Sequence, residues 1–338
     1  PVRGLPKTKS AIIQFKFIIV VFLLRNMFFG RSVSKLDQSR EEINGLGDNL
    51  STVVVHLGRT APIMSITKFL LLLILIWTQI PLTWAETSKK LILISIDGLR
   101  PEFYRDPKYG ATRLHGLALS GVSSIGLIPI FPSLTYADHS TLVTGVSSAR
   151  HGILSNTVFD PENGLTSQWY WHESNLKAPP LWQVAKSAGK SIAIIRWPAS
   201  VGAKVDWMIP EIFHSPGFDF KKDWALIQQN MQPAFLKEVI GDSGLTGISS
   251  LKDLDYFSTR AAVQVMTRHK PDLTLIHLVN LDLAQHLSGR ESEATRQALL
   301  HMDSLLGQIV DQVDLATTTI VVLGDHGFRD YTKVFHIN

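Results

Sequence analysis

The chain has 338 residues, of which 45% are hydrophobic and 18% charged, a composition typical of a globular protein rather than of a disordered or fibrous one. The absence of cysteine excludes disulfide bonds and thiolate metal sites. The net charge of +4 arises in residues 1–85, which hold ten of the 33 Lys and Arg but only four of the 29 acidic residues. From Glu86 onward 23 basic residues face 25 acidic ones, a net of −2, so we expect no binding to polymeric nucleic acid.

Residues 64–85 have the pattern of a secretory signal peptide. A short start that contains Lys68 precedes the apolar stretch Phe69–Trp77, and a small-residue cleavage site ends at Ala85. Cleavage there predicts export to the periplasm or the extracellular space. The alternative is a retained membrane anchor, although the apolar stretch is short for a span of about 20 residues.

Residues 1–63 are interpreted as an upstream extension outside the fold. They begin with Pro1 and carry a second apolar block, Phe17–Leu24, which is too short to cross a bilayer, although a second membrane segment is the competing interpretation. Membrane contact is therefore expected only through an uncleaved leader. The sequence does not indicate an oligomeric state.

Residues 86–338 alternate β-branched apolar runs with amphipathic stretches, which predicts one α/β catalytic domain with a mostly parallel sheet covered on both faces. A long loop is expected over residues 160–179, and an insertion or cap over residues 209–250. The expected strands are Leu91–Ile96, Ile125–Ile130, Ile192–Ile195, Leu273–Val279 and Thr318–Leu323. The expected helices include Ala111–Ser120, Pro180–Ala188, Trp224–Ile240 and Glu291–Val313.

Acidic and histidine side chains follow three of these strands. Asp97 follows the first strand, and Asp325 and His326 follow the last, so their side chains are expected at the same edge of a parallel sheet. Asp282 and His286 follow a third strand, and their spacing of four places them on one face of a helical turn. Alone, Asp97 fits a helix cap and the Asp282 pair a surface hydrogen bond; together they favour zinc, manganese or another divalent ion.

Thr135 is a candidate nucleophile because it precedes an expected helix in the segment Pro132–Gly145. A hydroxyl at a helix N-terminus lies beside free N–H groups and partial positive charge, which suit a nucleophile next to a bound phosphate. The competing interpretation is an ordinary N-cap residue.

Five segments together resemble the nucleotide pyrophosphatase/phosphodiesterases of the alkaline phosphatase superfamily. They extend from about Leu91 to Phe328, and the resemblance implies an alkaline-phosphatase-like sandwich. They are LILISIDGLRPEFY, PSLTYADHSTLVTGVSSARHGILSN, PPLWQVAKSAGKSIAIIRWPAS, NLDLAQHLSG and VVLGDHGF.

The resemblance implies a metal-dependent hydrolase that cleaves phosphodiester or pyrophosphate bonds of small nucleotide-type substrates. Thr135 would attack phosphorus to give a phosphothreonine intermediate, and Asn156 would donate to a phosphoryl oxygen, unless Asn156 is only a turn residue. Two zinc ions are implied, with manganese or another divalent metal as the alternative. One would be held by Asp97, Thr135, Asp325 and His326, and the other by Asp282 and His286.

The chain departs from the family pattern in two places. Where the family commonly has Thr-Phe-Pro-Asn-His, this chain has Thr-Tyr-Ala-Asp-His from Thr135 to His139. The family also takes a third ligand for the second zinc from a histidine farther downstream. We therefore expect a catalytic domain that is incomplete at its C-terminus, with His336 a poor substitute.

Other functions fit parts of the same pattern. A phosphonate hydrolase or a phosphomonoesterase of the same superfamily is the first alternative, whereas the absence of cysteine disfavours a sulfatase. A membrane-held binding protein on a decayed hydrolase fold is the non-enzymatic alternative. Trp169 and Tyr170, next to Trp171, are candidates to stack on a nucleotide base, unless they form a buried aromatic cluster.

Overall fold

The computed structural model describes residues 90–213, 219–243, 248–331 and 333. The expectations for residues 1–63 and 64–85, and for His336, lie outside the described residues. Within the described part of the chain, no helix is both long and apolar enough to cross a membrane.

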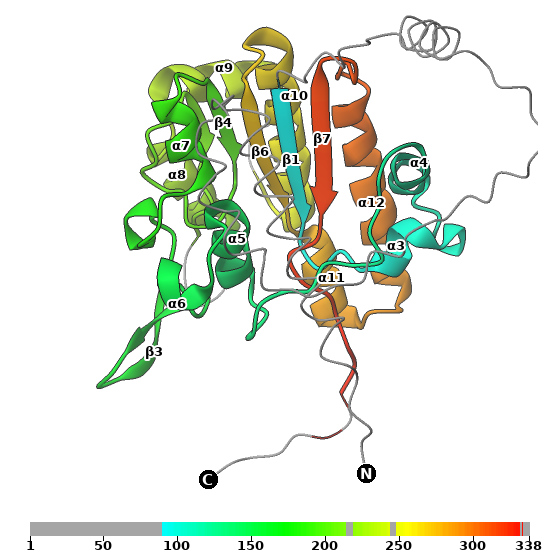
Figure 1. Cartoon of the computed structure of the whole chain (residues 1–338), viewed down its shortest axis with the longest axis horizontal. Helices are drawn as coiled ribbons and strands as arrows, with labels where there is room; N and C mark the ends of the chain where they lie inside the picture. The colour runs from blue at the N-terminus through cyan, green and yellow to red at the C-terminus, as the bar shows by residue number, and fades with distance from the viewer. Residues whose placement is uncertain (1–89, 214–218, 244–247, 332, 334–338) are drawn as a thin grey trace, which may run out of the picture. The chain divides into compact units, whose positions relative to one another are not determined.

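A five-stranded sheet in the order β5-β4-β6-β1-β7 forms the centre of the fold, and every neighbouring pair of strands is parallel (Figure 1). Two further strands pair as an antiparallel hairpin outside this sheet. The strands are β1 (Lys90–Ile96), β2 (Thr157–Asp160), β3 (Gly164–Trp169), β4 (Ile192–Ile195), β5 (Trp207–Ile209), β6 (Leu273–Leu278) and β7 (Thr318–Leu323).

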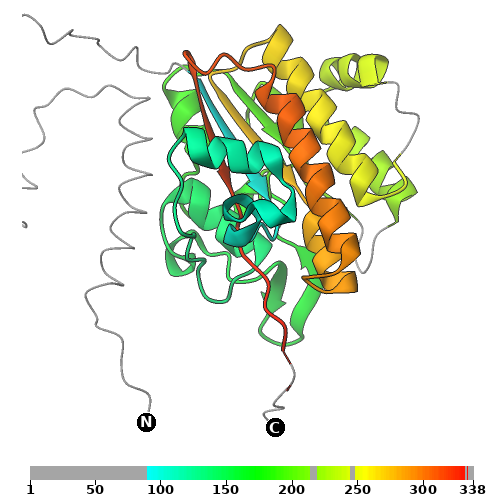
Figure 2. The same cartoon turned by 90° about the vertical axis from the view of Figure 1, so that its right-hand side faces the viewer.

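Helices cover both faces of the sheet. Helices α10 and α12 pack on one face, and α7 packs against β4 from the opposite side, as the view in Figure 2 shows. The helices are α3 (Pro101–Arg105), α4 (Thr112–Ser120), α5 (Thr135–Thr144), α6 (Ser148–His151), α7 (Leu181–Ser187), α8 (Phe220–Gln229), α9 (Pro233–Ser243), α10 (Leu251–Arg268), α11 (Asn280–Ser288) and α12 (Glu293–Val310). The α/β sandwich expected from the sequence is thus confirmed.

The register of the central strands determines where the site forms. Strand β1 lies between β6 and β7, and Ser95 is opposite both His277 and Leu323. Because the three strands are parallel and end together, the residues that follow them emerge at one edge of the sheet. In Figure 1 the arrowheads of β1 and β7 point to this edge, where α5 and α11 lie.

Three sequence-based assignments differ from the structure. Residues Ile125–Ile130 form no strand, and Ile125 and Ile128 are largely exposed; Pro129 within this run lacks the N–H that a central strand needs. The helix expected over Trp224–Ile240 is two helices, because Pro233 cannot continue α8 and instead begins α9. The expected loop over residues 160–179 includes most of the β2–β3 hairpin.

Candidate active site

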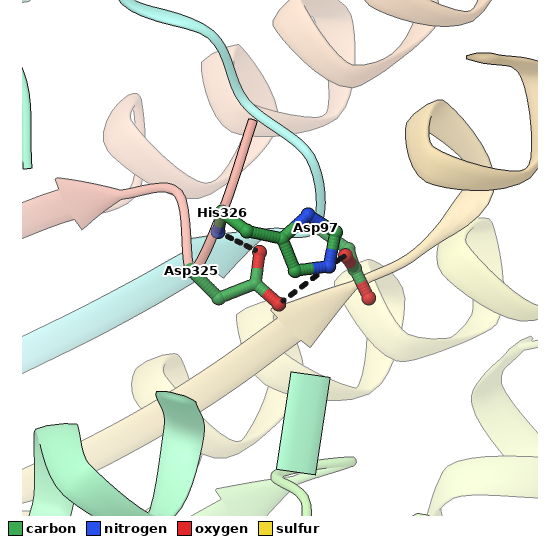
Figure 3. Close-up of side chains that lie close together, drawn as sticks. All are labelled: Asp97, Asp325 and His326. Atoms are coloured by element: carbon green, nitrogen blue, oxygen red, sulfur yellow. Dashed lines mark hydrogen bonds and ion pairs between the residues drawn. The ribbon is translucent and has the colours of Figure 1, made fainter. Parts of the chain in front are cut away.

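Asp97, Asp325 and His326 meet at the carboxyl edge of the sheet (Figure 3). His326 Nε2 lies 3.2 Å from Asp97 Oδ1 and 3.5 Å from Asp325 Oδ2. One ligand atom from each of the three residues lies within 4.8 Å of the others, close enough to hold one metal ion. Asp97 is not a helix cap, because α3 begins four residues later with Arg100 as its N-cap.

The backbone holds Asp325 in this orientation. Its Oδ1 accepts hydrogen bonds from the N–H groups of Gly98, at 3.1 Å, and His326, at 2.9 Å. Its Oδ2 is buried and accepts no hydrogen bond from the residues that the structure describes. One oxygen thus orients the carboxylate, while the other faces the cluster.

Asp282 and His286 face each other on α11, with 3.4 Å between Asp282 Oδ1 and His286 Nε2. The helix begins directly after β6, so this pair comes from the same edge of the sheet as the first cluster. Asp282 is close enough to Asp97 for its negative charge to raise the pKa of that carboxyl.

The group of Asp97, Asp325 and His326 fits a metal ion. Asp97 Oδ1 and Asp282 Oδ1, like Asp325 Oδ2, are buried oxygens without a hydrogen-bond partner among the described residues. Burying several carboxylates without compensating positive charge is costly. Burial raises the pKa of Asp97 well above its ordinary value, with added contributions from Asp325 and Asp282, and burial raises the pKa of Asp282 to about 6. A bound cation would favour the charged form of both groups.

Thr135 is the first residue of the ten-residue helix α5, whose N-cap, Leu134, makes no side-chain cap. Its Oγ1 lies 3.5 Å from His326 Nε2, so the hydroxyl borders the three-residue cluster. The N-terminus of α5, with its partial positive charge, therefore lies beside the same cluster. Thr135 is not the N-cap residue.

Asn156 contacts the turn that carries Thr135, since its Oδ1 accepts a hydrogen bond of 3.0 Å from the backbone N–H of Tyr136. The neighbour is a donor, so the carboxamide must present its oxygen to it, and Nδ2 is the atom left to donate elsewhere. Asn156 thus has a hydrogen-bonding role next to Thr135 that a simple turn residue lacks.

Trp169 and Tyr170 belong to a partly buried aromatic cluster around Tyr136, Ile153 and Ala199. The ring of Trp169 packs edge-on against Tyr136, with 5.4 Å between centroids, and against Phe213, with 4.7 Å. The cluster therefore lies next to the residue that follows Thr135. A stacking role toward a nucleotide base stays a prediction.

Two buried histidines lie behind the acidic cluster. His139 Nδ1 contacts the carbonyl oxygen of Thr135 at 2.7 Å and lies 3.5 Å from Asp325 Oδ2. His277 Nε2 lies 3.3 Å from Asp97 Oδ2, and the two imidazole rings pack with 4.4 Å between centroids. Burial lowers the pKa of both. Sequence reasoning did not single out His277, although a histidine inside an otherwise apolar strand is a detectable signal.

The chain is similar to known proteins in sequence and in fold. The family model described as type I phosphodiesterase/nucleotide pyrophosphatase matches residues 91–338. An uncharacterized pyrophosphatase/phosphodiesterase of Schizosaccharomyces pombe is 27% identical over 250 residues, which are 70% of this chain and 44% of that protein.

Two solved structures share the fold. Murine ectonucleotide pyrophosphatase/phosphodiesterase 5 has a TM-score of 0.50 at 21% identity, over 70% of this chain and 57% of its own, and an inactive variant of it has been solved in complex with AMP. Phosphonoacetate hydrolase from Sinorhizobium meliloti, in complex with phosphonoformate, has a TM-score of 0.51 at 21% identity, over 70% of this chain and 56% of its own. The chain spans about half the length of these relatives. It belongs to the type I phosphodiesterase/nucleotide pyrophosphatase family.

Proposed function

We propose that the protein is a metal-dependent hydrolase of phosphodiester or pyrophosphate bonds in small nucleotide-type substrates, with Thr135 as its nucleophile. The observation that carries the proposal is the position of Thr135 Oγ1, at the N-terminus of α5 and 3.5 Å from His326 Nε2 of the acidic cluster. Family membership and the AMP complex of the murine relative support the substrate class.

The residues divide into two candidate ligand sets. Two Zn²⁺ ions, with Mn²⁺ as the alternative, would act here as Lewis acids that stabilise negative charge on the phosphoryl and leaving oxygens. Asp97, Asp325 and His326, joined by Thr135, would hold one ion. Asp282 and His286 would hold the other.

The chain's own groups account for the covalent steps. Thr135 loses its hydroxyl proton to solvent, and its Oγ1 forms a bond to phosphorus as the bond to the leaving oxygen breaks. Water then hydrolyses the resulting phosphothreonine ester, which carries the nucleoside when the substrate is a nucleotide diester, and restores the hydroxyl. The partial positive charge at the N-terminus of α5 and the Asn156 amide would favour the negative phosphoryl oxygens.

Hydrolysis of three substrates tests this proposal. The purified, zinc-supplied protein is compared on 4-nitrophenyl thymidine monophosphate, 4-nitrophenyl phosphate and phosphonoacetate, with Thr135→Ala alongside. Faster cleavage of the diester, lost in the variant, is expected. Faster cleavage of phosphonoacetate would instead support the phosphonate hydrolase alternative, which the fold of the Sinorhizobium enzyme brings into consideration. If the folded, metal-loaded protein cleaves none of the three substrates, the result would instead support the non-enzymatic binding role.

We also propose export of the protein, on the basis of the leader pattern at residues 64–85. Sequencing the N-terminus of the mature protein tests it. A start at Glu86 is expected for a cleaved signal peptide, whereas an uncleaved leader found in the membrane fraction would identify an anchor.

A further inference from the structure

Helix α11, which carries Asp282 and His286, receives its N-terminal cap from a different helix. Its own N-cap residue, Val279, makes no side-chain cap. The carboxylate of Asp255 on α10 accepts hydrogen bonds from the N–H groups of Val279, at 3.0 and 3.1 Å, and of Asn280, at 2.7 Å. A carboxylate at this position satisfies N–H groups that the helix leaves unpaired and interacts favourably with the helix dipole.

Asp255 itself forms an ion pair with a buried arginine, Arg196. It is completely buried, and the guanidinium of Arg196, also buried, lies between it and Glu211. Arg196 Nη1 is 3.8 Å from Asp255 Oδ1, and Nη2 is 2.6 Å from Glu211 Oε2. Since Arg196 directly follows β4, the cap of α11 is anchored to the central sheet.

Gln285 ties the middle of α11 to the turn after β1. Its side chain is 2% exposed, and its Nε2 donates a hydrogen bond of 2.9 Å to the carbonyl oxygen of Gly98. Gly98 follows Asp97, and its own N–H donates to Asp325 Oδ1. Gly98 therefore connects α11 to Asp325 by hydrogen bonds and to Asp97 through the backbone.

We propose that Asp255 and Gln285 are positioning residues that fix α11, and thereby set the spacing between the Asp282/His286 pair and the Asp97/Asp325/His326 cluster. This inference rests on the metal sites of the proposed function. The cap fixes where the helix begins, and Gln285 fixes its distance from the Asp97 turn. Residues that orient metal ligands in this way typically change metal affinity by about 10- to 100-fold when replaced.

The chain contains a matched control for a cap that only stabilises the fold. Asp303 on α12 caps α4 in the same manner, because its carboxylate accepts hydrogen bonds from the N–H groups of Arg113, at 3.0 Å, and Leu114, at 2.8 Å. Helix α4 contains none of the candidate metal ligands. Asp303→Asn therefore weakens an equivalent cap, because it removes the negative charge and one of the two acceptor oxygens, without changing any candidate ligand.

Zinc titration of the EDTA-treated protein, monitored by calorimetry, tests the proposal, together with counting of the bound metal after dialysis. The proteins compared are the wild type, Asp255→Asn, Gln285→Leu and Asp303→Asn. The wild type is expected to bind two ions, the second more weakly, because the described residues supply only Asp282 and His286 for it. Asp255→Asn and Gln285→Leu should each lower the affinity for one ion by about 10- to 100-fold, while the affinity for the other ion stays as in the wild type. Asp303→Asn should lower the melting temperature and leave both affinities unchanged. The visible absorption of cobalt(II) at the weakened site should change in Gln285→Leu, because its ligand geometry changes, and should stay as in the wild type in Asp303→Asn.

The outcomes separate this inference from the proposed function. Wild-type affinity for both ions in folded Gln285→Leu overturns the positioning role, as does equal weakening of metal binding in Asp303→Asn. Gln285→Leu keeps the test decisive if Asp255→Asn fails to fold. Two bound ions without hydrolysis of any substrate would contradict the function and leave the inference intact. A wild type that binds fewer than two ions overturns the inference.

Discussion

Asn156 uses the two ends of one carboxamide for two purposes. Its oxygen accepts from the N–H of Tyr136, which follows the proposed nucleophile, and its nitrogen is left to donate to a phosphoryl oxygen. Replacing the amide with a carboxylate separates these purposes, because Oδ1 still accepts from Tyr136 whereas the second oxygen cannot donate and carries negative charge.

We expect Asn156→Asp to fold normally and to lose about 100- to 1000-fold in kcat for the diester, the typical cost of removing one donor to a developing oxyanion. Steady-state kinetics alongside circular dichroism provide the measurement. Asn156→Ala, which removes both interactions, should also lower the melting temperature. If Asn156→Asp keeps wild-type kcat, the Asn156 amide has no role toward the phosphoryl group.

At the scale of single elements, the turn after β1 is the most constrained part of the site. Gly98 has a φ of +68°, which favours glycine, and a Cβ placed there would lie 2.7 Å from Phe328 Cε2 and 2.8 Å from Gln285 Nε2. A side chain at this position must therefore displace either the segment after β7 or helix α11, both of which carry candidate ligands.

Gly98→Ala is expected to lower the free energy of unfolding by about 1 to 3 kcal/mol, from backbone strain together with overpacking. Gly202→Ala is the control, since Gly202 has a φ of +87° and a Cβ added to it would meet no described atom within 4 Å; it should cost about 1 kcal/mol or less. Urea unfolding of both variants measures the difference. Equal destabilisation would show that the contacts with Phe328 and Gln285 do not constrain Gly98.

The elements differ in how well the sequence predicts them. Strands β1, β6 and β7 were predictable because each is a run of apolar, mostly branched residues that ends at a polar turn. Ile125–Ile130 is also rich in branched apolar residues, but Ile125, Leu127 and Ile128 are exposed, so composition alone misassigned it. The capping of α11 by Asp255 joins residues 24 and 25 positions apart, and only the packing of α10 against the sheet brings them together.

For the site as well, the sequence predicted some features, whereas others depend on tertiary packing. Ligand types at strand ends were readable in the sequence because parallel strands that end together must collect them at one edge. The approach of Thr135 to His326, 191 residues apart, was not readable from spacing, since it depends on how α5 packs beside the sheet. His277 was missed because the strand that contains it was interpreted only as core.

Across the whole molecule, buried carboxyls couple stability to pH. Burial raises the pKa of Asp138 to about 7 and that of Asp255 to about 6, from the ordinary 3.8. Each group binds its proton more tightly in the folded state than in the unfolded state. Its contribution to stability is therefore complete below about pH 4 and is lost as pH rises through 6 to 7.

Asp138→Asn isolates one of these contributions, because the amide resembles the protonated carboxyl and its oxygen still accepts from the N–H of Ile130. In EDTA, wild type and variant should have similar stability at pH 4, and the variant should be more stable at pH 8 by on the order of 1 to 2 kcal/mol. Chemical unfolding across this pH range measures the difference. A constant difference at every pH would contradict the raised pKa.

The central claim is that Thr135 forms a covalent bond to phosphorus, and acid quenching followed by peptide mass spectrometry tests it most directly. Protein mixed with 4-nitrophenyl thymidine monophosphate and quenched during turnover should carry thymidine monophosphate on the peptide that contains Thr135. Thr135→Ala should carry none. Turnover of the diester with an unmodified Thr135 peptide, or with the adduct on another residue, would contradict the account.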